Sequence, residues 1–190
     1  MKVFLILLAI LIQPLHAQSG EKLVASARKQ IGVTLGYDPA YTSLKYPNGD
    51  VPMDRGVCTD VIIRAMRDGF SKDLQKLVHE DMAANFAVYP KNWGLSKTDK
   101  NIDHRRVPNL RTWFKRQGWQ LPLPAANESA KFLPGDIVTC TVPPNLPHVM
   151  IVSDKKTEGG IPLVIHNIGG GTVEQDMLFN FPLTGLYRQK

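Results

Sequence analysis

One short stretch of the chain places a cysteine directly before a helix-like run. In RGVCTDVIIRAMR, residues 55–67, Cys58 precedes apolar residues that recur at helical spacing. A thiol in the first turn of a helix is close to the positive end of the helix dipole and to free backbone N–H groups, so this pattern predicts a lowered thiol pKa. Cys58 is therefore a candidate nucleophile. The alternatives are half of a disulfide and a small buried side chain.

A nucleophilic cysteine needs a base, and two histidines are placed to supply one. His148 opens HVMIVSD and His166 closes PLVIH, two strand-like runs that the loop 155–161 joins. Antiparallel pairing of these runs brings both rings to the same edge of a hairpin. His16 lies in the expected leader, and His79 lies within a charged helical segment where an exposed or capping role is favoured.

Two further residues leave alternatives open. Asn167 follows His166, and either could orient the imidazole of the base, but neighbouring residues of a strand face opposite ways, so only one can do so. We favour His166. Cys140 shares a strand face with Val138, which indicates a buried core thiol. A disulfide between Cys58 and Cys140 is the competing expectation in an oxidising compartment, and it would consume the nucleophile.

Helical periodicity in the first half of the chain provides the scaffold for the cysteine. The segments are expected at residues 20–32, 58–69, 72–86 and 110–117. The expected helix ends are Gly32 and Gly69, and the expected N-caps of the last two helices are Ser71 and Asn109. The expected buried faces consist of Leu23, Val24, Ala27 and Ile31 in the first helix and Leu74, Leu77, Val78 and Met82 in the third.

The second half of the chain changes to short β-branched runs bounded by Gly, Pro or Asp. These runs cover residues 135–142, 148–154, 162–169 and 185–189, and they predict an antiparallel sheet. Helices followed by a strand meander indicate a single α+β domain, which about 170 residues suffice to build.

The first seventeen residues predict a secretory signal peptide. Lys2 precedes an apolar run of about ten residues, too short to span a bilayer, and cleavage is expected after Ala17. The mature domain is then residues 18–190, in the periplasm or outside the cell, with no transmembrane anchor.

Positive charge is concentrated in one segment. The chain carries a formal net charge of +6, and residues 97–118 contain seven Lys and Arg against two Asp. Such a segment suits an anionic polymer such as cell wall, surface polysaccharide or stray nucleic acid, or it is simply a solvated face. Within it, Arg105 and Arg106 present donors that match the carboxylates of peptidoglycan stem peptides. Alternatively, one of them pairs with Asp103 and fixes the loop. No metal-ligand spacing occurs, and residues 169–171 lack the Lys-Ser/Thr of a phosphate loop.

Several of these motifs resemble NlpC-type cell-wall peptidases, which have a papain-like fold. GDIV, HVMIVSD and VIHNIGGG follow the rhythm of that family, in which a Cys, a His and a third polar residue form the site. YPNGDVPMDRGVCTD is similar to the Tyr-x-x-Gly-Gly segment before the nucleophile, which would place Tyr46 beside the substrate. The chain departs from the family in having Val57 before the cysteine and Thr59-Asp60 after it. Asp60 would oppose thiol ionisation if it pointed inward and would cap the helix if it pointed outward.

A closer resemblance covers nearly all of the mature chain. RGVCTDVIIRAMR, VHEDM, NIDHRRVPNL, PGDIV and HNIGGG resemble a bacterial secreted family known as domain of unknown function 1287. The resemblance implies a papain-like α+β fold, with N-terminal helices packed on a small antiparallel sheet, and a reactive set of Cys58, His148 and His166.

The resulting expectation is a secreted, monomeric cysteine hydrolase without a cofactor, which cuts amide bonds of peptidoglycan stem peptides and does not act on nucleic acid. Cys58 would attack, His148 would carry the proton and His166 would hold the imidazole, while backbone amides stabilise the oxyanion. The expected substrate cleft contains Tyr46, Asp60, His104, Arg105, Arg106 and Asn167. The alternative is a non-catalytic envelope protein that binds anionic glycan or peptide on the same scaffold.

Overall fold

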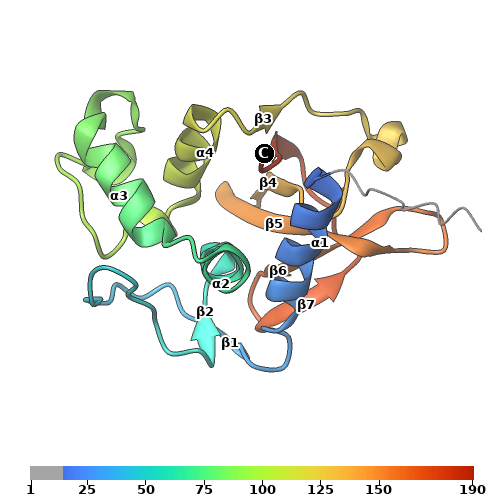
Figure 1. The fold of residues 1–190 in the computed structure, drawn as a ribbon, viewed down its shortest axis with the longest axis horizontal. Helices are drawn as coiled ribbons and strands as arrows, with labels where there is room; N and C mark the ends of the chain where they lie inside the picture. Colours follow the sequence, from blue (N-terminus) through green and yellow to red (C-terminus); the bar gives the residue numbers. More distant parts are fainter. Residues whose placement is uncertain (1–14) are drawn as a thin grey trace, which may run out of the picture.

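A group of helices packs against one face of a strongly curved antiparallel sheet (Figure 1). The computed structural model describes residues 15–190, so most of the predicted leader lies outside the described residues. The α-helices are α1 (Leu15–Arg28), α2 (Cys58–Phe70), α3 (Leu74–Ala84) and α4 (Val107–Arg116). Short 3-10 helices lie at Phe86–Val88, Asn92–Gly94, Asp103–Arg105 and Ala126–Lys131. Within residues 15–190, no helix is both long enough and apolar enough to cross a membrane.

Six strands form the main sheet in the order β3-β8-β4-β5-β6-β7, and every neighbouring pair is antiparallel. They are β3 (Gln120–Leu121), β4 (Ile137–Val142), β5 (Leu146–Lys156), β6 (Pro162–Asn167), β7 (Thr172–Gln175) and β8 (Leu183–Tyr187). A separate parallel pair, β1 (Gly36–Tyr37) and β2 (Arg55–Gly56), lies just before α2. The predicted mixture of helices and antiparallel strands is confirmed, and the hairpin of β5 and β6 is the predicted one.

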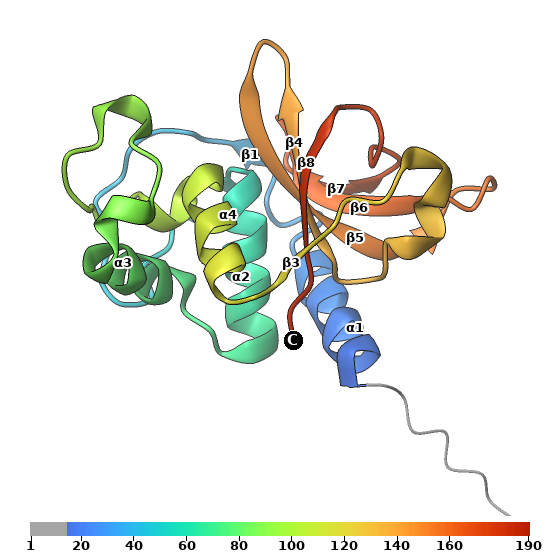
Figure 2. The same ribbon diagram turned by 90° about the horizontal axis from the view of Figure 1, so that it is seen from above.

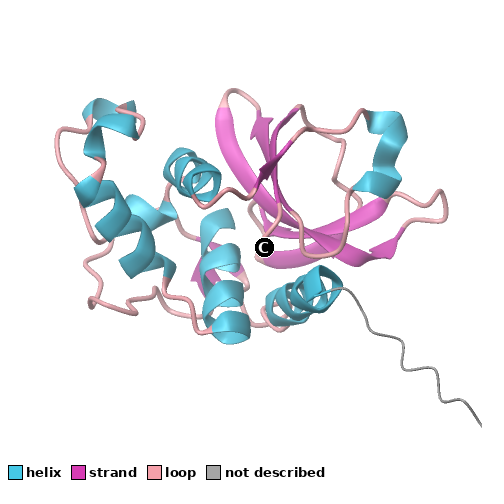
Figure 3. Cartoon of the chain, turned by 45° about the horizontal axis from the view of Figure 1, so that its top comes forward, coloured by secondary structure: helices cyan, strands magenta, loops and turns pink. Residues whose placement is uncertain are grey.

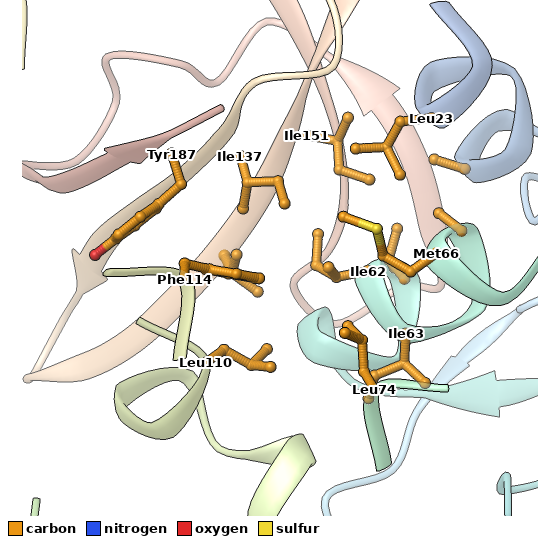
Figure 4. Close-up of a cluster of buried hydrophobic side chains, with 14 of the residues drawn as sticks. Leu23, Ile62, Ile63, Met66, Leu74, Leu110, Phe114, Ile137, Ile151 and Tyr187 are labelled. Atoms are coloured by element: carbon orange, nitrogen blue, oxygen red, sulfur yellow. The ribbon is translucent and has the colours of Figure 1, made fainter. Parts of the chain in front are cut away.

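Two apolar clusters cover the two faces of the sheet. Alternate residues of each strand point to opposite faces, so Val149 and Ile151 of β5 pack against the helices, while Met150 and Val152 pack on the other face. The helix-side cluster draws on all four α-helices, α1 to α4 (Figure 4). The far-side cluster is completed by the chain around Phe132 and by residues 177–183. The helices lie mostly on one side of the molecule and the strands on the other (Figures 2 and 3).

Four details of the first three expected helices are wrong. Helix α1 ends at Arg28, so Ile31 falls in the following turn and is exposed. Gly69 does not end α2, because the helix continues to Phe70 and the left-handed residue that ends it is Ser71. Asp73, rather than Ser71, caps α3 by accepting from the backbone N–H of Gln75. A further buried-face assignment also fails, since Leu77 of α3 is exposed.

The fourth helix begins three residues before the expected start. Its N-cap is Arg106 and it carries Pro108 in its first turn, where a missing N–H costs nothing. Asn109 therefore lies inside the helix, where its side chain donates to the carbonyl of Asp103 instead of capping. This earlier start fixes the backbone on both sides of Arg106.

Candidate active site

Cys58 is the first residue of α2, and its thiol is held against strand β5. Val57 before it is extended, and the Asp60 carboxylate accepts from the Val57 backbone N–H at 2.6 Å, which caps the helix start. The Cys58 side chain is buried, with 4% of the residue exposed. Its sulfur accepts from the backbone N–H groups of Val149 and Thr59.

Burial decides the protonation of this thiol. Desolvation is the main cause that raises the pKa of Cys58 to about 12; the N–H groups of Val149 and Thr59 oppose the shift, and the nearby Asp60 carboxylate and Cys140 add to it. The expectation of a lowered thiol pKa is therefore wrong. Stabilisation by the helix N-terminus is worth at most about 2 kcal/mol, which does not offset the cost of placing a thiolate in an apolar site. At neutral pH the thiol is protonated.

His148 and His166 lie together on the far face of the sheet from the helices. On β5 the helix-side residue is Val149, so His148 points to the other face, beside its cross-strand partner Cys140. His166 follows the helix-side Ile165 and shares the far face. The rings meet edge to face, and His148 Nε2 lies 2.9 Å from His166 Nδ1. The predicted meeting of the two imidazoles is thus what the structure shows.

Both imidazoles are neutral at pH 7. Burial lowers the pKa of His148 to about 3, with His166 adding to the shift, and burial lowers the pKa of His166 to about 4. A neutral imidazole has one donor and one acceptor nitrogen, so each ring must choose a tautomer that suits its neighbour.

The imidazole chain continues to Gln175 on β7, a residue that sequence reasoning missed. The amide nitrogen Nε2 of Gln175 lies 3.0 Å from His166 Nε2, and a rotation of the amide by 180° would place its oxygen there instead. If the amide donates its N–H, then His166 must donate from Nδ1 to His148, which leaves the proton of His148 on Nδ1. If the amide presents its oxygen, every donor reverses, and His148 Nδ1 becomes a free acceptor. Gln175 therefore determines whether the far nitrogen of His148 can accept a proton.

The thiol of Cys58, on α2, lies against β5 beside His148, but the two side chains are not hydrogen-bonded to each other. Among the described residues no hydrogen bond joins Cys58 to His148. The N–H that bonds the sulfur belongs to Val149, the residue next to His148. Because the N–H groups of a strand lie in the plane of the sheet, the sulfur is at the level of the β5 backbone, between the helix side and the imidazole side. Catalytic hydrogen bonds of free enzymes are often long and shorten when substrate binds.

A buried salt bridge holds the first turn of α2, next to Cys58, in place. Arg105 donates from Nε and Nη2 to the two carboxylate oxygens of Asp60, at 3.0 and 2.9 Å, and the two side chains are 2% and 4% exposed. The backbone carbonyl of Arg105 also accepts from the Thr59 hydroxyl. Asp60 and Arg105 are therefore structural partners of one another, and Arg105 is also on the lining of the cleft beside Cys58. The alternative of an arginine pairing with Asp103 also fails, since Asp103 bonds His79.

A small cleft of about 160 Å³ opens beside Cys58. Arg106 and Trp93 lie on its lining, and the Arg106 guanidinium stacks 4.7 Å from the centre of the Trp93 ring. Tyr37 is on the lining too, and burial together with the nearby Cys58 raises its pKa to about 12. Among residues 15–190, no group of three or more His, Cys, Asp or Glu is arranged to hold a metal ion.

The sequence profile of one family, described as Domain of unknown function (DUF1287), matches residues 24–189. The chain belongs to this family. The predicted membership is thereby confirmed. This DUF1287 chain is 52% identical over 174 residues to the uncharacterized protein YijF of Escherichia coli (strain K12), a match that covers 92% of the chain and 83% of YijF.

The fold of the DUF1287 chain is also found in solved structures. Two crystal structures of an N-acetylmuramoyl-L-alanine amidase from Bacteroides uniformis ATCC 8492 superpose with TM-scores of 0.57 and 0.54. Each covers 91% of this chain and all of the amidase chain, at 12% and 11% identity. At this identity the likeness shows a shared fold.

Three expected cleft residues of the DUF1287 chain lie elsewhere. The Tyr46 hydroxyl donates to Glu80, and Tyr46 is absent from the lining of the Cys58 cleft, where Tyr37 lies instead. His104 is buried, and burial lowers its pKa to about 3. Asn167 donates to the backbone carbonyls of Gly36 and Gly56, at 3.0 and 3.1 Å, and so ties β6 to the strand pair that precedes Cys58.

Cys140 is a free buried thiol, and so is Cys58. The disulfide alternative is therefore wrong for this structure. Cys140 belongs to the far-side apolar cluster with Val138, as its strand pattern predicts. It gives the DUF1287 chain a second buried thiol for comparison, one that is not on the lining of the cleft.

The basic segment 97–118 is partly neutralised by the fold. Arg105 is paired with Asp60, and Arg116 is paired with Asp81. Arg111 donates to the Tyr187 hydroxyl and the Thr184 carbonyl. The segment is thus not a uniform cationic surface, and Arg106 is the arginine of the segment that remains at the cleft without a carboxylate partner.

Proposed function

We propose that this protein is a peptidoglycan hydrolase, a cysteine hydrolase of papain-like, NlpC-type fold that cuts an amide bond of peptidoglycan stem peptides. One observation carries the proposal: Cys58, at the start of α2, is bonded to β5 beside His148, from which a hydrogen-bonded chain runs through His166 to Gln175. The likeness to an amidase fold, over 91% of the chain, supports the same class of reaction.

In the proposed reaction the Cys58 sulfur attacks the carbonyl carbon of the scissile amide. The thiol proton passes to Nδ1 of His148, and His148 then gives it to the leaving amine nitrogen as the C–N bond breaks. Water hydrolyses the thioester with the same base, which regenerates the thiol and releases the acid. The N–H of Cys58, in the first turn of α2, has no acceptor within the helix and is the proposed oxyanion donor.

The resting site is proposed to be neutral throughout. The raised pKa of Cys58 and the lowered pKa of His148 mean that proton transfer accompanies the attack instead of preceding it. In this scheme His166 holds His148, and Gln175, with its amide turned so that the oxygen faces His166, selects the tautomer in which His148 Nδ1 is an acceptor. His166 is preferred to Asn167 as the orienting residue because Asn167 is occupied by two backbone carbonyls.

The proposal includes export of the mature domain to the periplasm or outside, directed by residues 1–17, and action as a monomer. A second candidate is a non-catalytic envelope protein that binds anionic glycan or peptide on this scaffold. The burial of the Cys58 thiol favours that candidate, because an idle thiol needs no access to substrate.

The deciding experiment is mass analysis of purified peptidoglycan digested by the wild type, Cys58→Ala and Cys140→Ala. The hydrolase predicts new amide-cleavage products with the wild type and Cys140→Ala and none with Cys58→Ala. Identical products from the wild type and Cys58→Ala would defeat the hydrolase and leave the binding protein. Cys140→Ala tests whether the loss is specific to Cys58, because Cys140 is the other buried thiol and is not on the cleft lining.

A further inference from the structure

The cleft beside Cys58 has one charged group that the fold leaves unmatched. Only two charged residues, Arg105 and Arg106, lie on its lining, and no carboxylate does. Arg105 is matched by both carboxylate oxygens of Asp60. Arg106 forms no salt bridge with any residue of the described chain. The cleft next to the proposed nucleophile therefore carries a net positive charge.

The Arg106 guanidinium is held in place but lacks a hydrogen-bond acceptor. The Arg106 Cζ lies over the ring of Trp93, 4.7 Å from its centre, a cation–π contact that gives the guanidinium no hydrogen-bond acceptor, and 62% of Trp93 is exposed. Nη1 is shielded from solvent and has no acceptor within the described residues. A shielded donor without a partner is unfavourable in the free protein, so a shift of the guanidinium toward an acceptor bound in the cleft would be favoured.

The backbone on both sides of Arg106 is fixed, so the base of its side chain has a defined position before any ligand binds. Arg105 is locked to Asp60, and Asn109, one turn into α4, bonds the carbonyl of Asp103. Binding of a ligand would then carry no entropy cost for ordering this part of the loop, which favours affinity.

We propose that Arg106, stacked on Trp93, is a subsite for a free carboxylate of the substrate. The inference rests on the proposed function and narrows it: the stem peptides bound are those with an unmodified carboxylate close to the scissile amide, and amidated stems are disfavoured. A carboxylate accepts two parallel charge-assisted bonds from a guanidinium, whereas a carboxamide offers one neutral acceptor and an NH₂ group that opposes the arginine donors.

Binding, measured without turnover, tests this subsite. Isothermal titration of the Cys58→Ala protein uses two pairs of stem peptides, each pair differing by a single carboxylate-to-carboxamide change, at D-Glu in one pair and at diaminopimelate in the other. At least one carboxamide should bind roughly tenfold to hundredfold more weakly than its acid, the loss expected for hydrogen bonds to a charged group. Arg106→Met in the same background should bring that ratio to about one. Lys97→Gln removes an equal charge from an exposed position of the same segment and should leave the ratio unchanged.

The outcomes separate the subsite from the hydrolase. Equal affinities within both pairs, no binding of any peptide, or discrimination that survives Arg106→Met would each overturn the subsite. Because the peptide comparison is first made with Arg106 present, it stands even if Arg106→Met fails to fold. Acid-selective binding by Cys58→Ala, with no cleavage by the wild type, would support the subsite while removing the hydrolase. Cleavage of acid and amide forms at equal rates would do the reverse.

Discussion

The protonation of Cys58 can be read directly from its reaction with iodoacetamide as a function of pH. Burial raises the pKa of this thiol to about 12 from an ordinary value of 9.0, so at neutral pH the native protein holds about a thousandfold less thiolate than an unperturbed cysteine. Only the thiolate is alkylated. The rate at Cys58 should therefore keep rising through pH 10 without a plateau. At pH 7 it should be at least a thousandfold below the rate of the same cysteine in the unfolded chain.

The assay follows the peptide that contains Cys58 by mass spectrometry, in native buffer and in concentrated guanidinium chloride. Shielding of the sulfur slows the native rate equally at every pH, so the shape of the profile, not its height, reports the pKa. His148→Ala should leave that shape unchanged, because a neutral imidazole adds no charge near the sulfur. A plateau below pH 8 that disappears in His148→Ala would reveal a thiolate–imidazolium pair at rest. In that case, the conclusion that burial outweighs the helix N-terminus would be refuted.

Three further predictions concern the surroundings of the thiol. In assays of peptidoglycan cleavage, Gln175→Glu should retain kcat, because a carboxylate can only accept from His166. Gln175→Leu should lose roughly two- to tenfold in kcat, the contribution of one hydrogen bond, with little change in KM. Asp60→Asn or Arg105→Met should lower the free energy of unfolding by roughly 3 to 5 kcal/mol in urea titrations, and the double variant should lose less than the sum of the two. An additive double variant would mean that the pair contributes no coupling. Finally, His104, His148 and His166 have folded pKa values of about 3 to 4, so as the pH falls they bind protons in the unfolded chain before they do so in the folded protein. The free energy of unfolding should therefore fall as the pH drops from about 6.5 to 4.5. Equal stability at both pH values would contradict the burial of these histidines.

Local patterns predicted the elements that carry the site. Helical spacing after Cys58 and strand spacing around His148 and His166 are short-range signals, and they place the thiol at a helix start and the imidazoles on paired strands. The alternation rule also separates His166 from Asn167 correctly, since the two residues face opposite sides of β6.

Pairings between distant residues were beyond the reach of such patterns. Asp60 and Arg105 are 45 positions apart, and neither has a local feature that names the other. Gln175 lies on a four-residue strand of mixed polarity, and the only available signal was the strand-like return that follows the glycines at 169–171. Trp93 is on a loop where one exposed aromatic residue carries no spacing information. These contacts depend on tertiary packing, which leaves no helical or strand periodicity in a single sequence.

The raised pKa of Cys58 also results from tertiary packing, which buries the thiol. This pKa matters for the proposed export of the protein to an oxidising compartment. A free thiolate in an oxidising compartment is readily converted to a disulfide or sulfenic acid, because the thiolate is the form that reacts. Cys58 and Cys140 are both free, both buried and both protonated, with pKa values of about 12 and 11. In the proposed reaction, protonation at rest would protect Cys58 until a substrate carbonyl is present, and His148 would have to remove the proton during the attack. Under the proposed function, a neutral, buried thiol would allow an exported cysteine hydrolase to keep an unpaired cysteine, and the helix N-terminus would act on the oxyanion of the reaction instead of on the resting sulfur.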